Sequence, residues 1–87
     1  MKIEPNTDYS FGEVAELTIE FADKKENKYN EYAFNFVSGA TPTVLTLPDT
    51  VKWVNELTIE ANKRYEISIV DNIGLWCAVD YIPEVSE

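Results

Sequence analysis

A strict alternation of apolar and polar residues, repeated along most of the chain, constrains the fold more than any other feature. Ala15, Leu17, Ile19 and Phe21 alternate with glutamate and threonine. A period of two places such an apolar set on one face of a β-strand. The same pattern recurs at residues 32–36, 45–47, 51–53, 57–59, 65–69 and 75–81. These segments are rich in the β-branched and aromatic residues that strands favour, so the sequence predicts a chain of short strands.

The segments between the predicted strands have the composition of turns. The polar stretch 23–28 is expected to close a hairpin between the first two strong strands, and the stretches 60–63 and 71–74 have hairpin lengths. Residues 38–42 and 48–50 contain proline and break the chain. A succession of about six to eight short strands predicts an all-β fold, either an antiparallel β-sandwich or a flattened barrel.

The segment 50–60 has one helical alternative. Val51, Val54 and Leu57 lie at helical spacing, but Trp53 and Ile59 are residue types that strands favour. We therefore prefer strands at 51–53 and 57–59.

A chain of 87 residues allows one domain with one small core. We expect a flexible lead at residues 1–12, a single β domain at 13–82 and a C-terminal tail at 83–87. The core is expected to contain the apolar residues that are in phase along the strands, namely Leu17, Ile19, Phe21, Tyr32, Phe34, Phe36, Leu45, Leu47, Trp53, Ile67 and Ile69.

Charge and composition argue against several classes of function. The net charge is −9 and the isoelectric point is near 4.3, a balance that repels phosphate backbones and anionic membranes. The chain has no histidine, which removes histidine-based general bases and nearly all zinc sites. Cys77 is the only cysteine, as expected for a protein folded in a reducing cytoplasm. Neither a signal peptide nor a membrane span is predicted.

The acidic residues carry only weak signals of catalysis or metal binding. Glu16 and Glu20 share a predicted solvent face, but no pattern pairs a buried acid with an exposed one. Residues 71–74 are a fragment of a calcium-loop pattern, and a hairpin turn explains them fully. We therefore predict no catalytic residue, no metal and no cofactor, and expect that the protein is not an enzyme.

Two aromatic residues near the C-terminus are candidates for contact with a partner. Trp76 is out of phase with Leu75 and Cys77, so it is expected either at a subunit interface or ligand site, or in a second core layer. Tyr81 is proposed to join the same contact surface. Cys77 lies on the apolar face predicted for this strand, with no basic neighbour, and is expected to be a buried, inert thiol.

The stretch from Tyr32 to Val79 resembles a known group of proteins. An aromatic-alternating strand leads to Ser-Gly-Ala-Thr-Pro-Thr at 38–43 and Leu-Thr-Leu-Pro at 45–48, followed by Val-Lys-Trp at 51–53, Ile-Glu-Ala-Asn-Lys at 59–63, Tyr-Glu-Ile-Ser-Ile-Val at 65–70 and Asn-Ile-Gly at 72–74. This order is similar to the C-terminal β modules of virion structural proteins, of head-fibre, tail-fibre or baseplate type, in phages of gut Firmicutes.

The resemblance implies a non-enzymatic structural or appendage module of a phage or prophage particle, used in assembly or surface attachment. It implies a homo-oligomer, with a trimer favoured, that associates with other virion proteins. It also implies a protein that is made in the host bacterial cytoplasm and located in the virion. The alternative is a carbohydrate-binding module, on a phage particle or a secreted enzyme, that contacts a cell-surface glycan. That alternative requires two or more exposed aromatic side chains on one face.

Overall fold

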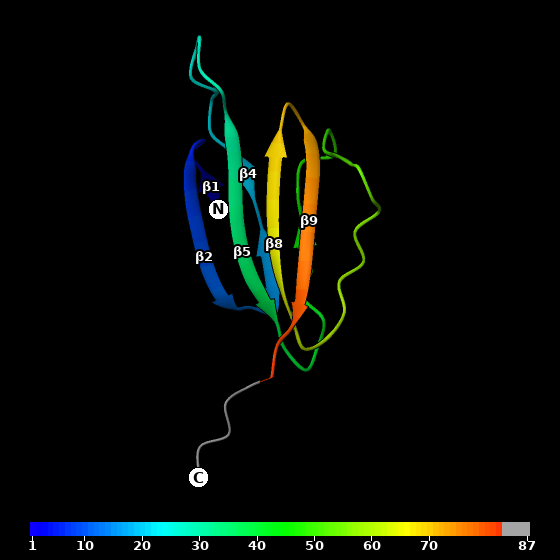
Figure 1. Cartoon of the computed structure of the whole chain (residues 1–87). Helices are drawn as coiled ribbons and strands as arrows, with labels where there is room; N and C mark the ends of the chain where they lie inside the picture. The colour runs from blue at the N-terminus through cyan, green and yellow to red at the C-terminus, as the bar shows by residue number, and fades with distance from the viewer. Residues whose placement is uncertain (83–87) are drawn as a thin grey trace.

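The computed structural model describes residues 1–82 and contains only strands, turns and irregular segments over that range. Its strands are β1 (Lys2–Ile3), β2 (Thr7–Glu13), β3 (Glu16–Thr18), β4 (Glu20–Phe21), β5 (Glu31–Ser38), β6 (Val44–Thr46), β7 (Lys52–Trp53), β8 (Lys63–Val70) and β9 (Ile73–Asp80). They form two packed layers (Figure 1), so the predicted all-β, sandwich-like fold is confirmed.

The larger layer is a five-stranded sheet in the order β2-β5-β8-β9-β7. Its long central strands β5, β8 and β9 pair antiparallel, whereas β2 pairs parallel with β5, and β7 pairs parallel with the start of β9. Figure 1 shows β2, β5, β8 and β9 side by side, with the smaller layer behind them. The most buried strand is β5, because the sheet and the smaller layer enclose it.

The smaller layer is built around the strand segment 16–21. Its β3 part pairs parallel with β6, and its β4 part pairs parallel with β1. The two neighbours lie on opposite edges of the segment. Ile19 N–H donates to Thr46 O at 2.9 Å on one edge, while Glu20 N–H donates to Met1 O at 2.7 Å on the other. Successive residues of the segment thus form backbone hydrogen bonds on opposite edges.

The core lies between the two layers. Of the eleven residues predicted for it, seven are buried (Leu17, Ile19, Tyr32, Phe34, Phe36, Ile67 and Ile69), and the other four are partly buried and pack against them (Phe21, Leu45, Leu47 and Trp53). Ile3 and Tyr65 complete the buried cluster. Rings stack along it, with Phe36 and Tyr65 centroids 5.4 Å apart and nearly parallel.

Several details differ from the sequence expectation. Four of the six ladders are parallel, so the sheets are mixed rather than antiparallel. Residues 23–28 cross between the layers instead of closing a hairpin, because β4 and β5 belong to different sheets. Residues 57–59 form no strand. Residues 1–12, expected as a flexible lead, contain β1 and most of β2. The predicted tail at 83–87 lies outside the described residues.

The β8–β9 hairpin follows the turn chemistry of its sequence. Asp71 and Asn72 both have positive φ, at 52° and 64°, as a two-residue type I′ turn requires. The glycine that follows has a different role. A Cβ at Gly74 would lie 2.6 Å from the Trp53 ring, so glycine is needed there for the close approach of β7.

Candidate docking surface

The two faces of β9 are set by its pairing with β8. Trp76 lies opposite Ile67, and Ala78 lies opposite Tyr65. Residues opposite each other in an antiparallel ladder point to the same face. Because Ile67 and Tyr65 are buried in the core, Trp76 and Ala78 lie on the core side. Leu75, Cys77 and Val79 therefore lie on the outer side of the sheet.

Trp76 is partly buried and packs against the core, as the second of the two sequence alternatives expected. Its ring centroid is 5.9 Å from that of Tyr65, and its Nε1 donates to Asn55 O at 2.9 Å. The prediction of a buried Cys77 was wrong, since this residue is exposed. The physical reason is that burying an indole removes far more apolar surface than burying a thiol, so the strand turns its largest side chain inward.

Tyr81 lies just past the end of β9 and is partly buried. Its N–H donates to Asn62 O at 2.9 Å, which fixes the chain at the start of β8. The structure thus does not bring Tyr81 and Trp76 together as one exposed surface.

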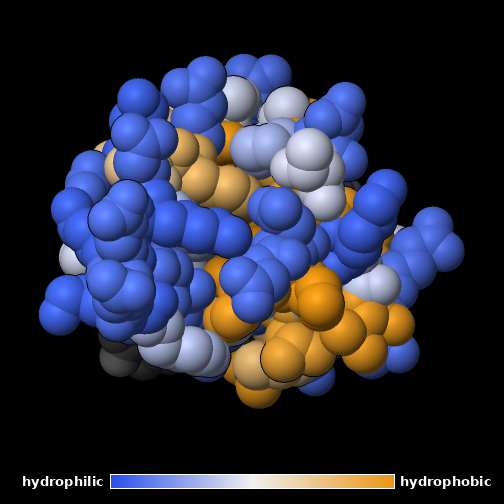
Figure 2. All heavy atoms as spheres, turned by 90° about the horizontal axis from the view of Figure 1, so that it is seen from above, coloured by the Kyte–Doolittle hydropathy of each residue, from blue (hydrophilic) through white to orange (hydrophobic). Residues whose placement is uncertain are grey.

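The outer side of β9 carries a continuous series of apolar side chains, called here the β9 row: Ile73, Leu75, Cys77 and Val79. Ile73, Leu75 and Val79 are 52%, 55% and 59% exposed. Figure 2 shows a hydrophobic patch on the side of the molecule where β9 lies. Contiguous exposed apolar side chains typically mark contact sites, whereas isolated ones need no explanation.

The β9 row lies on a sheet edge that is only partly covered. β7 pairs with Ile73 and Gly74 alone. The last backbone hydrogen bond from that side is Val54 N–H to Gly74 O, at 3.0 Å. The chain after Val54 is held by side chains of the core side, since Trp76 Nε1 donates to Asn55 O and Tyr65 Oη donates to Thr58 O. Within residues 1–82, the edge at 75–80 therefore has no backbone partner.

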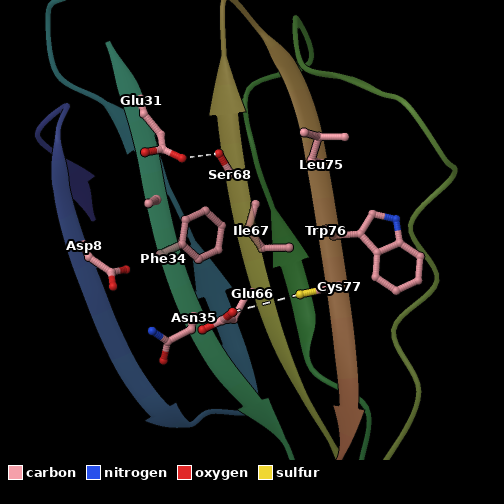
Figure 3. A pocket seen from close by; sticks show the side chains of 11 residues that line it. Asp8, Glu31, Phe34, Asn35, Glu66, Ile67, Ser68, Leu75, Trp76 and Cys77 are labelled. Atoms are coloured by element: carbon pink, nitrogen blue, oxygen red, sulfur yellow. Dashed lines mark hydrogen bonds between the residues drawn. The ribbon is translucent and has the colours of Figure 1, made fainter. Parts of the chain in front are cut away.

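A shallow hollow of about 470 Å³ lies beside the β9 row, on the outer face of the sheet. It is lined by Leu75 and Cys77 of the row, by polar side chains of β5 and β8, and by Asp8 of β2 (Figure 3). Ser68 Oγ donates to Glu31 Oε2 at 2.5 Å, and Cys77 Sγ lies 4.0 Å from Glu66 Oε2. The hollow is thus acidic toward β2 and β5 and apolar toward β9.

Charged residues near the β9 edge are largely paired. Lys63 Nζ lies 2.9 Å from Asp80 Oδ1, and Arg64 Nη1 lies 3.1 Å from Glu66 Oε1. The hydrogen bond from Lys63 to Asp80 and the charge of that carboxylate raise the pKa of Lys63. The edge is therefore close to neutral locally, although the whole chain carries a charge of −9.

The aromatic residues do not form an exposed platform. All eleven lie within residues 1–82, and only Tyr29, at 70%, is more exposed than buried. A second, apolar groove of about 330 Å³ contains Trp53, with Leu45, Leu47, Pro48, Val51, Leu57 and Ile59. Its tryptophan packs against the core and beneath Gly74. A sugar ring would need aromatic faces turned to solvent, which these positions do not offer.

Comparisons of the chain with protein-family models, with curated proteins and with solved structures found no match. Within residues 1–82, no group of three or more histidine, cysteine, aspartate or glutamate side chains is placed to hold a metal ion. The same part of the chain contains no helix that could span a membrane.

The sequence reasoning missed the β9 row as a candidate site. The sequence does indicate such a surface, because residues 73–79 include apolar side chains at both odd-numbered and even-numbered positions. A strand of this kind is either covered on both sides or leaves one apolar side open. The sequence alone does not say which parity faces the core.

Proposed function

We propose that this chain is a non-enzymatic structural module that associates with other proteins through the β9 row. The observation that carries the proposal is the coincidence of this row with an uncovered sheet edge. An exposed, apolar edge strand is a liability that proteins normally protect. Association with a partner that covers this edge would explain why the strand lacks protecting charges and proline from Ile73 to Val79.

The sequence resemblance to phage virion modules supplies the setting of the proposal. Particle appendages are assemblies of many copies, in which a small β domain gains stability from its neighbours. We therefore propose a role in the assembly or surface attachment of a phage or prophage particle. A trimer remains the oligomer that the resemblance favours.

The carbohydrate-binding alternative has less support. It requires at least two exposed aromatic side chains on one face, and within residues 1–82 only Tyr29 is largely exposed. The outer face carries carboxylates and aliphatic side chains instead. These groups suit protein contact better than stacking on sugars.

The setting is tested on particles induced from the bacterium that encodes the chain. Particles purified by density gradient should contain the chain by mass spectrometry, and an antibody against it should label them in electron micrographs. Recovery of the chain only in the soluble lysate, with unlabelled particles, would refute a structural role in the virion.

The docking surface is tested by substitution. Leu75→Lys should weaken association with the partner at least tenfold, because a charge would be buried in the contact. Val44→Lys is a matched control, since Val44 is an equally exposed aliphatic residue, at 59%, on the separate strand β6. The light-scattering mass after size exclusion, over a hundredfold range of concentration, measures self-association. Equal effects of the two variants would refute the assignment of the surface.

A further inference from the structure

The two uncovered edges of the five-stranded sheet are built differently. The edge strand β2 carries Asp8 and Glu13, and its register is interrupted between Ser10 and Glu13, where Gly12 has φ +70°. Charges and bulges of this kind are how proteins keep edge strands from pairing. By contrast, β9 has neither charge nor proline from Ile73 to Val79. Only the β9 edge is thus open to another strand.

The backbone of β9 shows which groups are available there. Asn72 O accepts a hydrogen bond from Lys52 N–H of β7 at 2.7 Å, and Gly74 O accepts one from Val54 N–H, just after β7, at 3.0 Å. The backbone groups of the even-numbered residues therefore point toward the uncovered edge. Tyr81 N–H bonds to Asn62 on the opposite, β8 side. By this alternation, Trp76, Ala78 and Asp80 direct their N–H and C=O groups outward. They form a short ladder that lacks its second strand.

Charge determines which arrangement of two copies is favourable. Stacking the outer faces of two copies would bring Asp8, Glu31 and Glu66, which line the acidic hollow, against the same carboxylates. Pairing at the β9 edge leaves those carboxylates at a distance. The charges beside the edge are already compensated by the Lys63–Asp80 and Arg64–Glu66 pairs. A strongly basic partner is therefore not required, and self-repulsion at the edge is small.

The length of the uncovered edge is also suited to a second copy. A long added strand would collide with β7, which occupies the edge at Ile73 and Gly74. The 75–80 segment of a second copy has the same short length, and it brings the apolar side chains of Leu75, Cys77 and Val79 to the same outer face of the sheet. An isologous, two-fold contact needs this kind of self-complementary surface.

We infer that two copies of the chain pair their β9 strands antiparallel, around a two-fold axis at Ala78. This inference rests on the proposed function and names the partner of the same surface. It departs from the trimer that the resemblance favours, because a two-fold contact closes with two copies. The register places Ala78 opposite Ala78 of the second copy, and Trp76 opposite Asp80 of the second copy. All three outward-pointing residues of each strand then hydrogen-bond, and the sheet continues from one copy into the other. Cys77 lies opposite Val79 of the second copy, and the β9 rows of the two copies form one apolar surface.

Disulfide trapping tests this register. In an antiparallel ladder, residues in a non-hydrogen-bonded pair have Cα atoms about 4.5 Å apart, within the range of a disulfide. Val79→Cys should therefore cross-link nearly completely under mild oxidation, through Cys77 of one copy and the new cysteine of the other. Leu75→Cys is the matched control. It adds an equally exposed cysteine to the same face of β9, at a position that the register places far from Cys77 of the second copy.

A second variant tests the backbone pairing. Ala78→Pro removes an N–H that points away from β8, so the β8–β9 ladder should persist and circular dichroism should be unchanged. The two-fold contact would lose both hydrogen bonds between the Ala78 residues. We expect at least a tenfold loss of dimer affinity by sedimentation equilibrium, since each such bond contributes about 1 kcal/mol and about 1.4 kcal/mol is tenfold.

The outcomes separate this inference from the proposed function. If the chain associates but Val79→Cys links no better than Leu75→Cys, edge pairing is refuted, and the docking surface stands. Efficient linking of the unaltered chain through Cys77 would overturn the register. A monomer at every concentration, with no cross-link, would refute pairing with a second copy. Labelled particles would then still support the structural role in the virion.

Discussion

The phenol of Tyr65 is expected to hold the irregular segment 55–60 against the sheet. Tyr65 is 1% exposed, and its Oη donates to Thr58 O at 3.1 Å and accepts from Glu60 N–H at 2.7 Å. Tyr65→Phe keeps the ring contacts and removes both hydrogen bonds. A backbone group left without its partner costs about 1–3 kcal/mol when buried. Since both groups are near the surface and water reaches them in part, we expect a total loss of about 2 kcal/mol.

Urea denaturation followed by tryptophan fluorescence measures this loss. About 2 kcal/mol corresponds to a fall in Tm of roughly 8–16 °C for a domain of this size. Tyr29→Phe is the matched control, because Tyr29 is 70% exposed, and its stability should stay within about 0.5 kcal/mol of the unaltered chain. Amide exchange at Glu60 should accelerate in Tyr65→Phe only. Equal stability of the two variants would refute the assigned role of the phenol.

Three further predictions concern local geometry. Gly74→Ala should cost about 1–3 kcal/mol in urea denaturation, because the added methyl overlaps the Trp53 ring. Asn72→Ala should cost about 1 kcal/mol in the same assay, since alanine disfavours a φ of 64°. Burial raises the pKa of Tyr32 above its ordinary value of 10.0. The resulting stability is complete below about pH 10 and is lost as the pH rises through the raised pKa, so alkaline unfolding should be less steep in Tyr32→Phe. A similar slope in both proteins would contradict this.

The period of two was sufficient to predict much of the sandwich. It identified β5 and β8 because every second residue from Tyr32 to Phe36 and from Tyr65 to Ile69 is apolar and buried. It also identified the polar turn at Asp71 and Asn72. Parallel pairing was not predictable in the same way. The ladders β1–β4, β2–β5 and β3–β6 join segments distant in sequence, and nothing in a strand's own alternation specifies its neighbour.

The N-terminal strands were missed for a related reason. In β2, only Tyr9 and Phe11 alternate with polar residues, and Gly12 interrupts the pattern. Both rings pack against the core only because β5 supplies a parallel partner at Phe34, opposite Tyr9. The stability of such an edge strand comes from tertiary contact rather than from its own sequence, so the segment appeared to be a lead.

The wrong face of β9 was predicted to point toward the core, because a strand's own alternation does not specify its neighbours. This error concerns the residues of the candidate docking surface. A strand with apolar residues at both parities gives no preference for either face, and the choice depends on which side chain the neighbouring strand can bury. Tyr65 on β8 accommodates the Trp76 indole, and this leaves Leu75 and Val79 in contact with water. Had the isolated domain alone shaped this strand, polar residues at the outer positions would have cost nothing and protected the edge. Polar residues are absent from these positions, which agrees with the contact that we propose at the β9 row.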